Sequence, residues 1–461
     1  MKVLLVTTPP AKESIDLSSF LCSEPLALEY IGAGIKDHHD VRIVDLRVDS
    51  EPGLKEVLET FQPDILGCGA YTLGVNTVKQ ICADAKKILP GIITMAGGLH
   101  ASLQPEDYFE DYIDIVVIGE GVFPVKKLCA CLEKRRSLEE VENIAFKVDG
   151  RWVFTSKTPH PPLDSLPFPA RELTSHIRNS YYGHYLDMPF AHVRGSAGCT
   201  YSCIICSVSK MLNRKVYRHS IDRILQELDS INESIVIWVD DEFLLDGQWA
   251  SELASAINSA GIKKKHNFST RTDSVKKRPG LIEEWAKIGL ESVFVGFESC
   301  RESDLKKMGK GTTLSDTEEF VRIVRENNIS AQGNFIVYPD FTKTDFEDII
   351  NYILDLKVGY QNLSVLTPLP GTKLYEMEKD NFITHNYNLF DQAHTILPTR
   401  LPLKEFFKEF TNIFTKINTP GGGMKRFKLL PMKKRLEILD LMTKMTEKLQ
   451  NAYRDYDKHL W

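Results

Sequence analysis

The sequence lacks any apolar run long enough to cross a membrane. No stretch of about 18 consecutive apolar residues occurs in the chain, so no transmembrane helix is expected. The short apolar run that follows Met1 has no cationic segment before it and no small-residue cleavage site after it. That pattern predicts a buried first strand and excludes a secretory signal peptide.

A dominant charge is also missing, since 57 Lys and Arg residues face 63 Asp and Glu residues, for a net charge of −6. No basic domain dominates the chain, which argues against a nucleic-acid partner. The nine cysteines are an odd number and most are scattered, so they do not form the disulfide framework of a secreted protein. We therefore expect a cytoplasmic protein, and its 461 residues suffice for two or three domains.

The first 145 residues alternate short apolar strands with amphipathic helices. This alternation predicts a parallel, doubly wound α/β sheet in a Rossmann-like domain. The expected strands are 2–7, 41–45, 64–69, 92–96 and 115–118, and the expected helices are 26–36, 53–61 and 76–89.

Glycine-containing turns follow three of these strands. They are Tyr71-Thr72-Leu73-Gly74, Gly97-Gly98-Leu99-His100 and Gly119-Glu120-Gly121. All three fall at the carboxyl ends of their strands, where open α/β sheets bind ligands.

A proline-rich stretch at 159–169 predicts a linker, which we place at residues 146–188. Strand and helix then alternate again over residues 189–400, and six βα units predict a partial (β/α)6 TIM-type barrel. Residues 401–461 form a helical C-terminal region, for which a solvated cap is favoured over a helix on a membrane surface. The six expected barrel strands are 191–195, 235–239, 266–270, 292–297, 332–337 and 362–366.

Three cysteines, Cys199, Cys203 and Cys206, follow the first barrel strand with the spacing C-x3-C-x2-C. A cubane cluster normally takes four thiolates, so three leave one iron open for a ligand that is not protein. An open metal position indicates chemistry, whereas a filled one indicates structure. The alternative is a zinc knuckle completed by His192 or His219, but neither histidine has zinc-finger spacing.

The spacing and position of the cysteines resemble the radical S-adenosylmethionine (SAM) superfamily. The resemblance implies a [4Fe–4S] cluster whose open iron is chelated by SAM, and a 5′-deoxyadenosyl radical made by SAM cleavage. It also implies an external electron donor of the flavodoxin or ferredoxin type. Ile205 stands where the family usually has an aromatic residue near the adenine.

Polar residues at the next strand ends fit the same resemblance. Asp240, Asp241 and Glu242 suit the SAM ammonium group, although helix capping could occupy one of them. Arg271 is expected to pair with the SAM carboxylate. Glu298 and Ser299 resemble the pair that contacts the SAM ribose or carboxylate.

A Rossmann-like domain before such a barrel resembles the cobalamin-binding (B12) radical SAM enzymes. The three glycine-containing turns, 71–74, 97–100 and 119–121, are then the expected cobalamin contacts. The D-x-H-x-x-G motif of other B12 proteins is absent, which implies a corrin without a lower histidine ligand. The alternative is a domain of the same fold that binds no cofactor.

Three segments, 24–30, 240–243 and 452–461, look like the hopanoid C-3 methylase group. The resemblance implies a cobalamin-dependent methyltransferase acting on an unactivated carbon of a small-molecule or lipid substrate, held where the two domains meet. The alternatives are a cobalamin radical SAM enzyme that rearranges its substrate without methylation and, more remotely, a non-catalytic cobalamin or redox sensor. The catalytic side chain and the substrate are not indicated.

Overall fold

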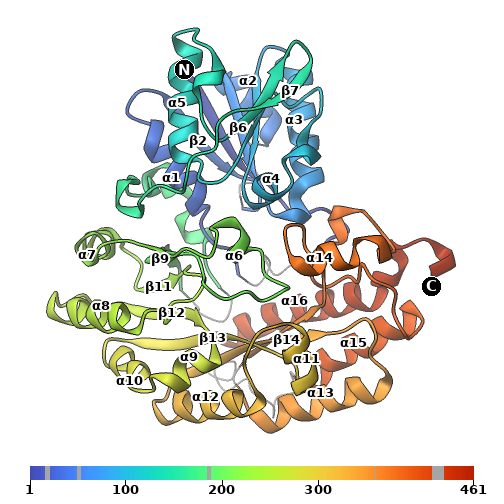
Figure 1. The fold of residues 1–461 in the computed structure, drawn as a ribbon. Helices are drawn as coiled ribbons and strands as arrows, with labels where there is room; N and C mark the ends of the chain where they lie inside the picture. Colours follow the sequence, from blue (N-terminus) through green and yellow to red (C-terminus); the bar gives the residue numbers. More distant parts are fainter. Residues whose placement is uncertain (16–20, 49–52, 184–187, 359, 418–429, 461) are drawn as a thin grey trace. The chain divides into compact units, whose positions relative to one another are not determined.

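The computed structural model describes the chain except residues 16–20, 49–52, 184–187, 359, 418–429 and 461 (Figure 1). Two compact units are present. Unit 1 comprises residues 1–14, 22–181 and 386–388, and unit 2 comprises residues 15–21, 182–385 and 389–461. Each unit has its own sheet and is described by itself below. No helix of the described residues is both long enough and apolar enough to cross a bilayer.

Unit 1 contains a seven-stranded sheet in the order β2-β1-β3-β4-β5-β6-β7. The first five strands along the chain pair in parallel, as the sequence predicts. The last two strands lie antiparallel and extend the sheet beyond β5. The strands are β1 (Lys2–Thr7), β2 (Asp40–Asp45), β3 (Ile65–Gly69), β4 (Ile93–Gly97), β5 (Ile115–Val117), β6 (Ile144–Val148) and β7 (Arg151–Phe154).

Helices cover both faces of this sheet, because each strand of the parallel part is apolar on both sides. Helices α1 (Leu26–Ile35) and α5 (Val122–Glu133) pack on one face, with Val3 and Leu5 of β1. Helices α2 (Leu54–Phe61) and α3 (Val75–Ile88) pack on the other face, with Leu4 and Val6. The linker expected at 146–188 thus begins inside β6, and unit 1 continues to Tyr181.

Unit 2 contains a six-stranded, all-parallel sheet in the order β15-β14-β13-β12-β11-β8. This order confirms the partial barrel of six βα units. The strands are β8 (Phe190–Val193), β11 (Ile235–Trp238), β12 (Lys265–Thr270), β13 (Leu290–Glu298), β14 (Ser330–Val337) and β15 (Tyr360–Val365). The main helices between them are α7 (Ile221–Ser230), α8 (Gly247–Ser259), α10 (Gly280–Lys287), α12 (Leu314–Glu326) and α13 (Lys343–Leu356).

Two helices close unit 2 at its C-terminal end, α15 (Leu403–Ile417) and α16 (Met432–Asn451). Phe406, Phe407 and Phe410 of α15 are fully buried in the core of unit 2. The chain after α16 packs into the same core through Tyr453 and Tyr456. The segment that follows α16 is therefore part of the hydrophobic core of unit 2.

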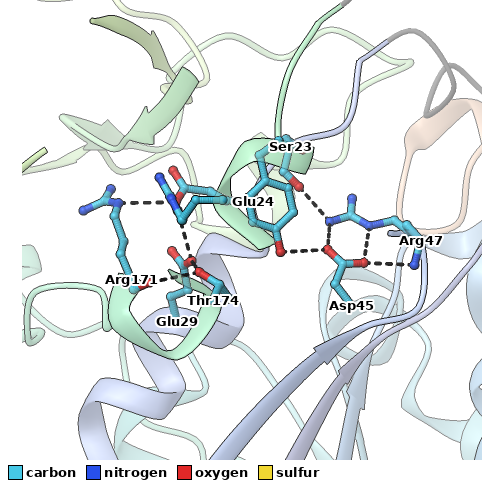
Figure 2. A network of polar contacts seen from close by, with 9 residues as sticks. Ser23, Glu24, Glu29, Asp45, Arg47, Arg171 and Thr174 are labelled. Carbon is cyan, nitrogen blue, oxygen red and sulfur yellow. Dashed lines mark hydrogen bonds and ion pairs between the residues drawn. The ribbon is translucent and has the colours of Figure 1, made fainter. Parts of the chain in front are cut away.

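A buried polar network fixes the last segment of unit 1, the 3-10 helix η5 (Arg171–Ser180), as Figure 2 shows. The side chain of Arg171 reaches Glu24 at 3.3 Å, and the Thr174 hydroxyl donates to Glu29 at 2.5 Å. Arg178 pairs with both glutamates. Two members of the 24–30 segment therefore have a structural task, which is to hold η5 against α1.

Candidate functional site

The cysteine loop (residues 198–206) leaves the first barrel strand through a short antiparallel pair, β9 (Ser196–Ala197) with β10 (Tyr217–Arg218). Gly198 begins the loop at a φ of 101°, where L side chains are rarely found. A Cβ at this position would lie 2.1 Å from the carbonyl oxygen of Lys215. Glycine is therefore required directly before Cys199.

Two carboxylates at the end of β11 hold the start of this loop. Asp240 accepts hydrogen bonds from the Gly195 N–H at 2.9 Å and from the Ser196 hydroxyl at 2.6 Å. Asp241 accepts from the Gly198 N–H at 2.7 Å. Burial raises the pKa of Asp240 to about 7 despite these hydrogen bonds.

The third acid of this run, Glu242, turns toward the next strand. It accepts a hydrogen bond from the Thr270 hydroxyl at 2.7 Å, and burial raises its pKa to about 7. The N-terminus of α8 is capped by Asp246 instead. None of the three acids is thus the helix cap that the sequence left open as an alternative.

Arg271, at the end of β12, lies against the cysteine loop. Its guanidinium stacks 3.7 Å above the Tyr201 ring, and its Nη1 lies 3.7 Å from the sulfur of Cys203. Its other nitrogens donate to Asp273 at 2.8 Å and to the Lys310 carbonyl at 2.5 Å. The sequence predicts that this cation pairs with the SAM carboxylate, and the structure places it beside Cys203, one of the expected cluster ligands.

Glu298 ends β13 in a left-handed conformation, with a φ of 68°. Lys310 donates to one of its carboxylate oxygens at 2.5 Å, and Asn334 donates to the other at 3.2 Å. Ser299 turns away and donates to Asp304 at 2.8 Å. Of this expected pair, only Glu298 is thus held in the polar cluster with Lys310.

The cysteine loop is also tied to two later segments. The Ile204 N–H donates to the Met308 carbonyl at 3.0 Å, and the Ile204 carbonyl accepts from the Leu374 N–H at 2.9 Å. Ile205 packs at the edge of the core of unit 2. Met308 and Leu374 thus anchor the loop from two segments that are far from it in the sequence.

The chemistry of the donor set fits a cubane cluster. Cys206 is exposed and the other two cysteines are partly exposed, so the loop lies outside the closed core of unit 2. Among the described residues, no three His, Cys, Asp or Glu side chains converge as they would around a single metal ion. The three thiols are thus not arranged as a one-ion zinc knuckle.

In unit 1, the three glycine-containing turns lie at one edge of the sheet and are bonded together. The Ala70 N–H donates to the Gly97 carbonyl at 3.2 Å, and the His100 N–H donates to the Ala70 carbonyl at 3.3 Å. Gly98, with a φ of 95°, has no room for a Cβ, which would lie 2.8 Å from the Ala70 nitrogen. Ser102 joins the third turn by accepting from the Gly119 N–H at 2.8 Å.

The outer side of this edge is open, as a bound cobalamin requires. A Cβ built on Gly119 would meet no atom within 4 Å, although its φ of 78° favours glycine. Tyr71 is 69% exposed, whereas its neighbour Thr72 is buried. The edge therefore has a backbone cradle and an exposed aromatic ring.

His100 does not face this open edge. Its side chain is completely buried, with Nδ1 3.1 Å from the Thr72 hydroxyl and Nε2 2.8 Å from Asp107. The structure thus places this residue behind the cradle. The other members of the three turns lie at the edge itself, at 71–74, 97–98 and 119–121.

Several polar partners were not foreseen from the sequence, above all Lys310, Asn334, Asp107 and Tyr387. Lys310 lies in the stretch 307–313, to which no part of the site was assigned from the sequence. Tyr387 donates to Asp107 at 2.7 Å across 280 positions of sequence. No local pattern marks such a contact.

Comparisons with known proteins agree with both halves of this description. Residues 15–128 match the family described as "B12 binding domain", and residues 193–353 match "Radical SAM superfamily". The chain is 32% identical over 417 residues to hopanoid C-3 methylase of Methylococcus capsulatus, which covers 89% of this chain and 78% of that protein.

Solved structures share the fold. The cobalamin-dependent SAM radical enzyme OxsB, with aqua-cobalamin bound, superposes with a TM-score of 0.73 over 98% of this chain and 72% of that one, at 18% identity. The radical SAM methyltransferase TsrM of Kitasatospora setae, with cobalamin and a [4Fe–4S] cluster, gives 0.65 over 82% and 75%, at 17% identity.

Proposed function

The chain belongs to the cobalamin-dependent radical SAM methyltransferases, and we propose that it methylates an unactivated sp3 carbon of a polycyclic lipid. The observation that carries this proposal is the 32% identity to hopanoid C-3 methylase across both the B12-binding and the radical SAM parts. The alternative substrate class is a polar small molecule.

Side chains alone cannot perform this reaction, because no protein base removes a proton from an unactivated C–H bond. The chemistry must come from a cofactor that supplies a radical, while the protein supplies position and electrostatics. Cys199, Cys203 and Cys206 would hold the [4Fe–4S] cluster, and the edge at 71–74, 97–98 and 119–121 would hold cobalamin.

The residues around the cysteine loop keep it in one geometry. Asp240 and Asp241 fix the backbone before Cys199, and Arg271 adds a positive charge beside Cys203. A cation near a thiolate stabilises its charged form. Glu298 and Lys310 form a buried ion pair at the end of the next strand. The Lys310 carbonyl accepts a hydrogen bond from Arg271, which connects this pair to the cysteine loop.

The test is anaerobic reconstitution with iron, sulfide, cobalamin and SAM carrying a deuterated methyl group, with a flavodoxin or ferredoxin as electron donor. We expect a pentacyclic triterpenoid to exchange one hydrogen atom for a CD3 group, together with formation of 5′-deoxyadenosine and S-adenosylhomocysteine. Formation of 5′-deoxyadenosine without a mass gain would favour a rearrangement. Labelling of polar metabolites but not of triterpenoids would overturn the lipid assignment.

A further inference from the structure

Four side chains of unit 1 form a continuous hydrogen-bonded chain, here called the relay: the buried Thr72 and His100 and the partly exposed Asp107 and Tyr387. We propose that the relay fixes the loop that supports cobalamin, with Tyr387 as a positioning residue and with no bond from His100 to cobalt. The proposal rests on cobalamin binding and is independent of the methyl acceptor.

The geometry of the relay defines which atoms donate. Burial alone would raise the pKa of Asp107, but hydrogen bonds from His100 and Tyr387 lower it. Asp107 is therefore a carboxylate that only accepts, so the Tyr387 hydroxyl and the His100 Nε2–H both donate to it. The remaining ring nitrogen, Nδ1, then carries no proton and accepts a hydrogen bond from the Thr72 hydroxyl.

This arrangement leaves His100 no nitrogen for a metal. Both ring nitrogens are within hydrogen-bond distance of a partner, and the side chain is 0% exposed. Binding of cobalt would require the loss of one of these hydrogen bonds and the movement of a buried ring. In other B12 proteins, a histidine is the lower ligand of cobalt. In this chain, the relay keeps His100 in a position that supports the loop after β3.

The supported element is the loop that follows β3. Thr72 begins the 3-10 turn η1 (Thr72–Gly74), and its side chain is drawn inward by His100. The preceding residue, Tyr71, then points outward and is 69% exposed. The Ala70 carbonyl accepts from the His100 N–H, so one residue holds the loop through both its backbone and its side chain.

Tyr387 comes from a three-residue segment, 386–388, that clusters with unit 1 while the residues on both sides of it cluster with unit 2. Its ring lies edge-on to His100, with centroids 4.9 Å apart. Asn76 also donates to Asn386 and Asn388, at 3.3 and 3.0 Å. Loss of the Tyr387 hydroxyl should therefore leave this segment in place.

Tyr108 provides a matched control. Its ring is also edge-on to His100, at 5.8 Å, and it is fully buried, but its hydroxyl has no hydrogen-bond partner among the described residues. Y387F and Y108F thus remove the same atom from the same neighbourhood. Only Y387F breaks the relay.

The experiment measures the dissociation constant of hydroxocobalamin for the full-length, cluster-reconstituted protein by absorbance titration. We expect Y387F to weaken binding about fivefold to tenfold, as the loss of a hydrogen bond to a charged group predicts, and Y108F to change it less than about twofold.

Two results would overturn the proposal. One is equal weakening by Y387F and Y108F, or no weakening by Y387F, because the relay would then not matter for the loop. The other is a nitrogen superhyperfine splitting in the EPR spectrum of bound cob(II)alamin that disappears in H100Q, because His100 would then be a cobalt ligand. Neither measurement requires the methyl acceptor, so failure of the lipid assignment would leave both unaffected.

Discussion

The two units begin their helices in different ways. In unit 2, side chains cap the starts of α8, α12, α13 and α14 (Lys373–Glu378), through Asp246, Thr313, Thr342 and Thr372, although α10 and α16 begin without a side-chain cap. In unit 1, the helices α2, α3 and α5 begin after Gly53, Gly74 and Gly121, with no side-chain cap. These three glycines lie on the side of the sheet where the parallel strands end.

The difference reflects how each unit holds its cofactor. A capped helix satisfies its first N–H groups internally, whereas an uncapped one leaves them for backbone, solvent or a ligand. In unit 2, the expected cluster ligands are cysteine thiols, so helix N–H groups are not needed to bind the cluster. Unit 1 offers an edge of backbone and glycine, which suits a large cofactor that is bound by shape and hydrogen bonds.

The strongest test of this contrast is C203A. A cluster ligand cannot be replaced by a methyl group, so we expect iron content and the cluster absorbance to fall and SAM cleavage to be lost. Cobalamin binding should remain, because its expected contacts lie in unit 1. Absorbance titration of the variant with hydroxocobalamin measures this directly, and loss of both cofactors together would contradict the division of labour.

The same contrast explains what could be predicted from the sequence. The cysteines were predicted because thiolate ligands require one residue type at a fixed spacing, and the parallel strands because their apolar runs are continuous. The roles of Asp240 and Asp241 were not, since their partners are backbone N–H groups, which no side-chain pattern displays.

Long-range pairing could not be predicted either. Strand β6 pairs with β5 across a helix and a loop, and Tyr387 contacts Asp107 from far along the chain. Such contacts depend on where the fold brings distant segments together. His100 was predicted to contact cobalamin, but it is buried behind the turn because of contacts with Asp107 and Tyr387 that no local pattern shows.

A pair of glycine substitutions compares the two sites at the level of the backbone. In G198A, the new Cβ would lie 2.1 Å from the Lys215 carbonyl oxygen, at a φ of 101°. We expect a loss of stability on the order of 3 kcal/mol or more, together with loss of the cluster, because backbone must move. Chemical denaturation of the apoprotein measures the change.

The matched variant is G119A, where the φ is 78° but no atom lies within 4 Å of the new Cβ. Only the conformational cost of a left-handed residue applies, about 1 kcal/mol. Because the methyl group enters the open edge, we expect the free energy of cobalamin binding to fall by more than the free energy of unfolding. A larger stability loss in G119A than in G198A would reverse the proposed contrast.

A buried ion pair gives unit 2 a pH dependence. His394 is fully buried, with its ring nitrogens 2.8 Å from Asp391 and 3.2 Å from Asp455. Burial lowers the pKa of His394, but the two carboxylates outweigh it and raise the pKa to about 9. This stabilisation is complete below the unfolded value of 6.5 and is lost as the pH rises through 9.

We therefore expect the free energy of unfolding of unit 2 to fall by an amount on the order of 3 kcal/mol between pH 6 and pH 10. Denaturation followed by the fluorescence of Trp238, Trp249 and Trp285, all in unit 2, would report it. H394Q should flatten this part of the profile. An equally steep profile in H394Q would assign the pH dependence to other groups.

The smallest expected effects test the helix starts themselves. Thr342 and Asp345 form a reciprocal capping box on α13, so T342A should lower the free energy of unfolding by about 1 kcal/mol.

Gly53 precedes α2 with extended dihedrals, φ −62° and ψ 159°, and a Cβ there would meet no atom within 4 Å. G53S can therefore place a hydroxyl over the free N–H groups of α2 and should stabilise unit 1 by a few tenths of a kcal/mol. Gly53 is not part of the edge formed by 71–74, 97–98 and 119–121. If cobalamin binds only at that edge, G53S should leave cobalamin affinity unchanged. A lower affinity in G53S would extend the cofactor site to the start of α2, and would make the uncapped helices a property of the whole edge.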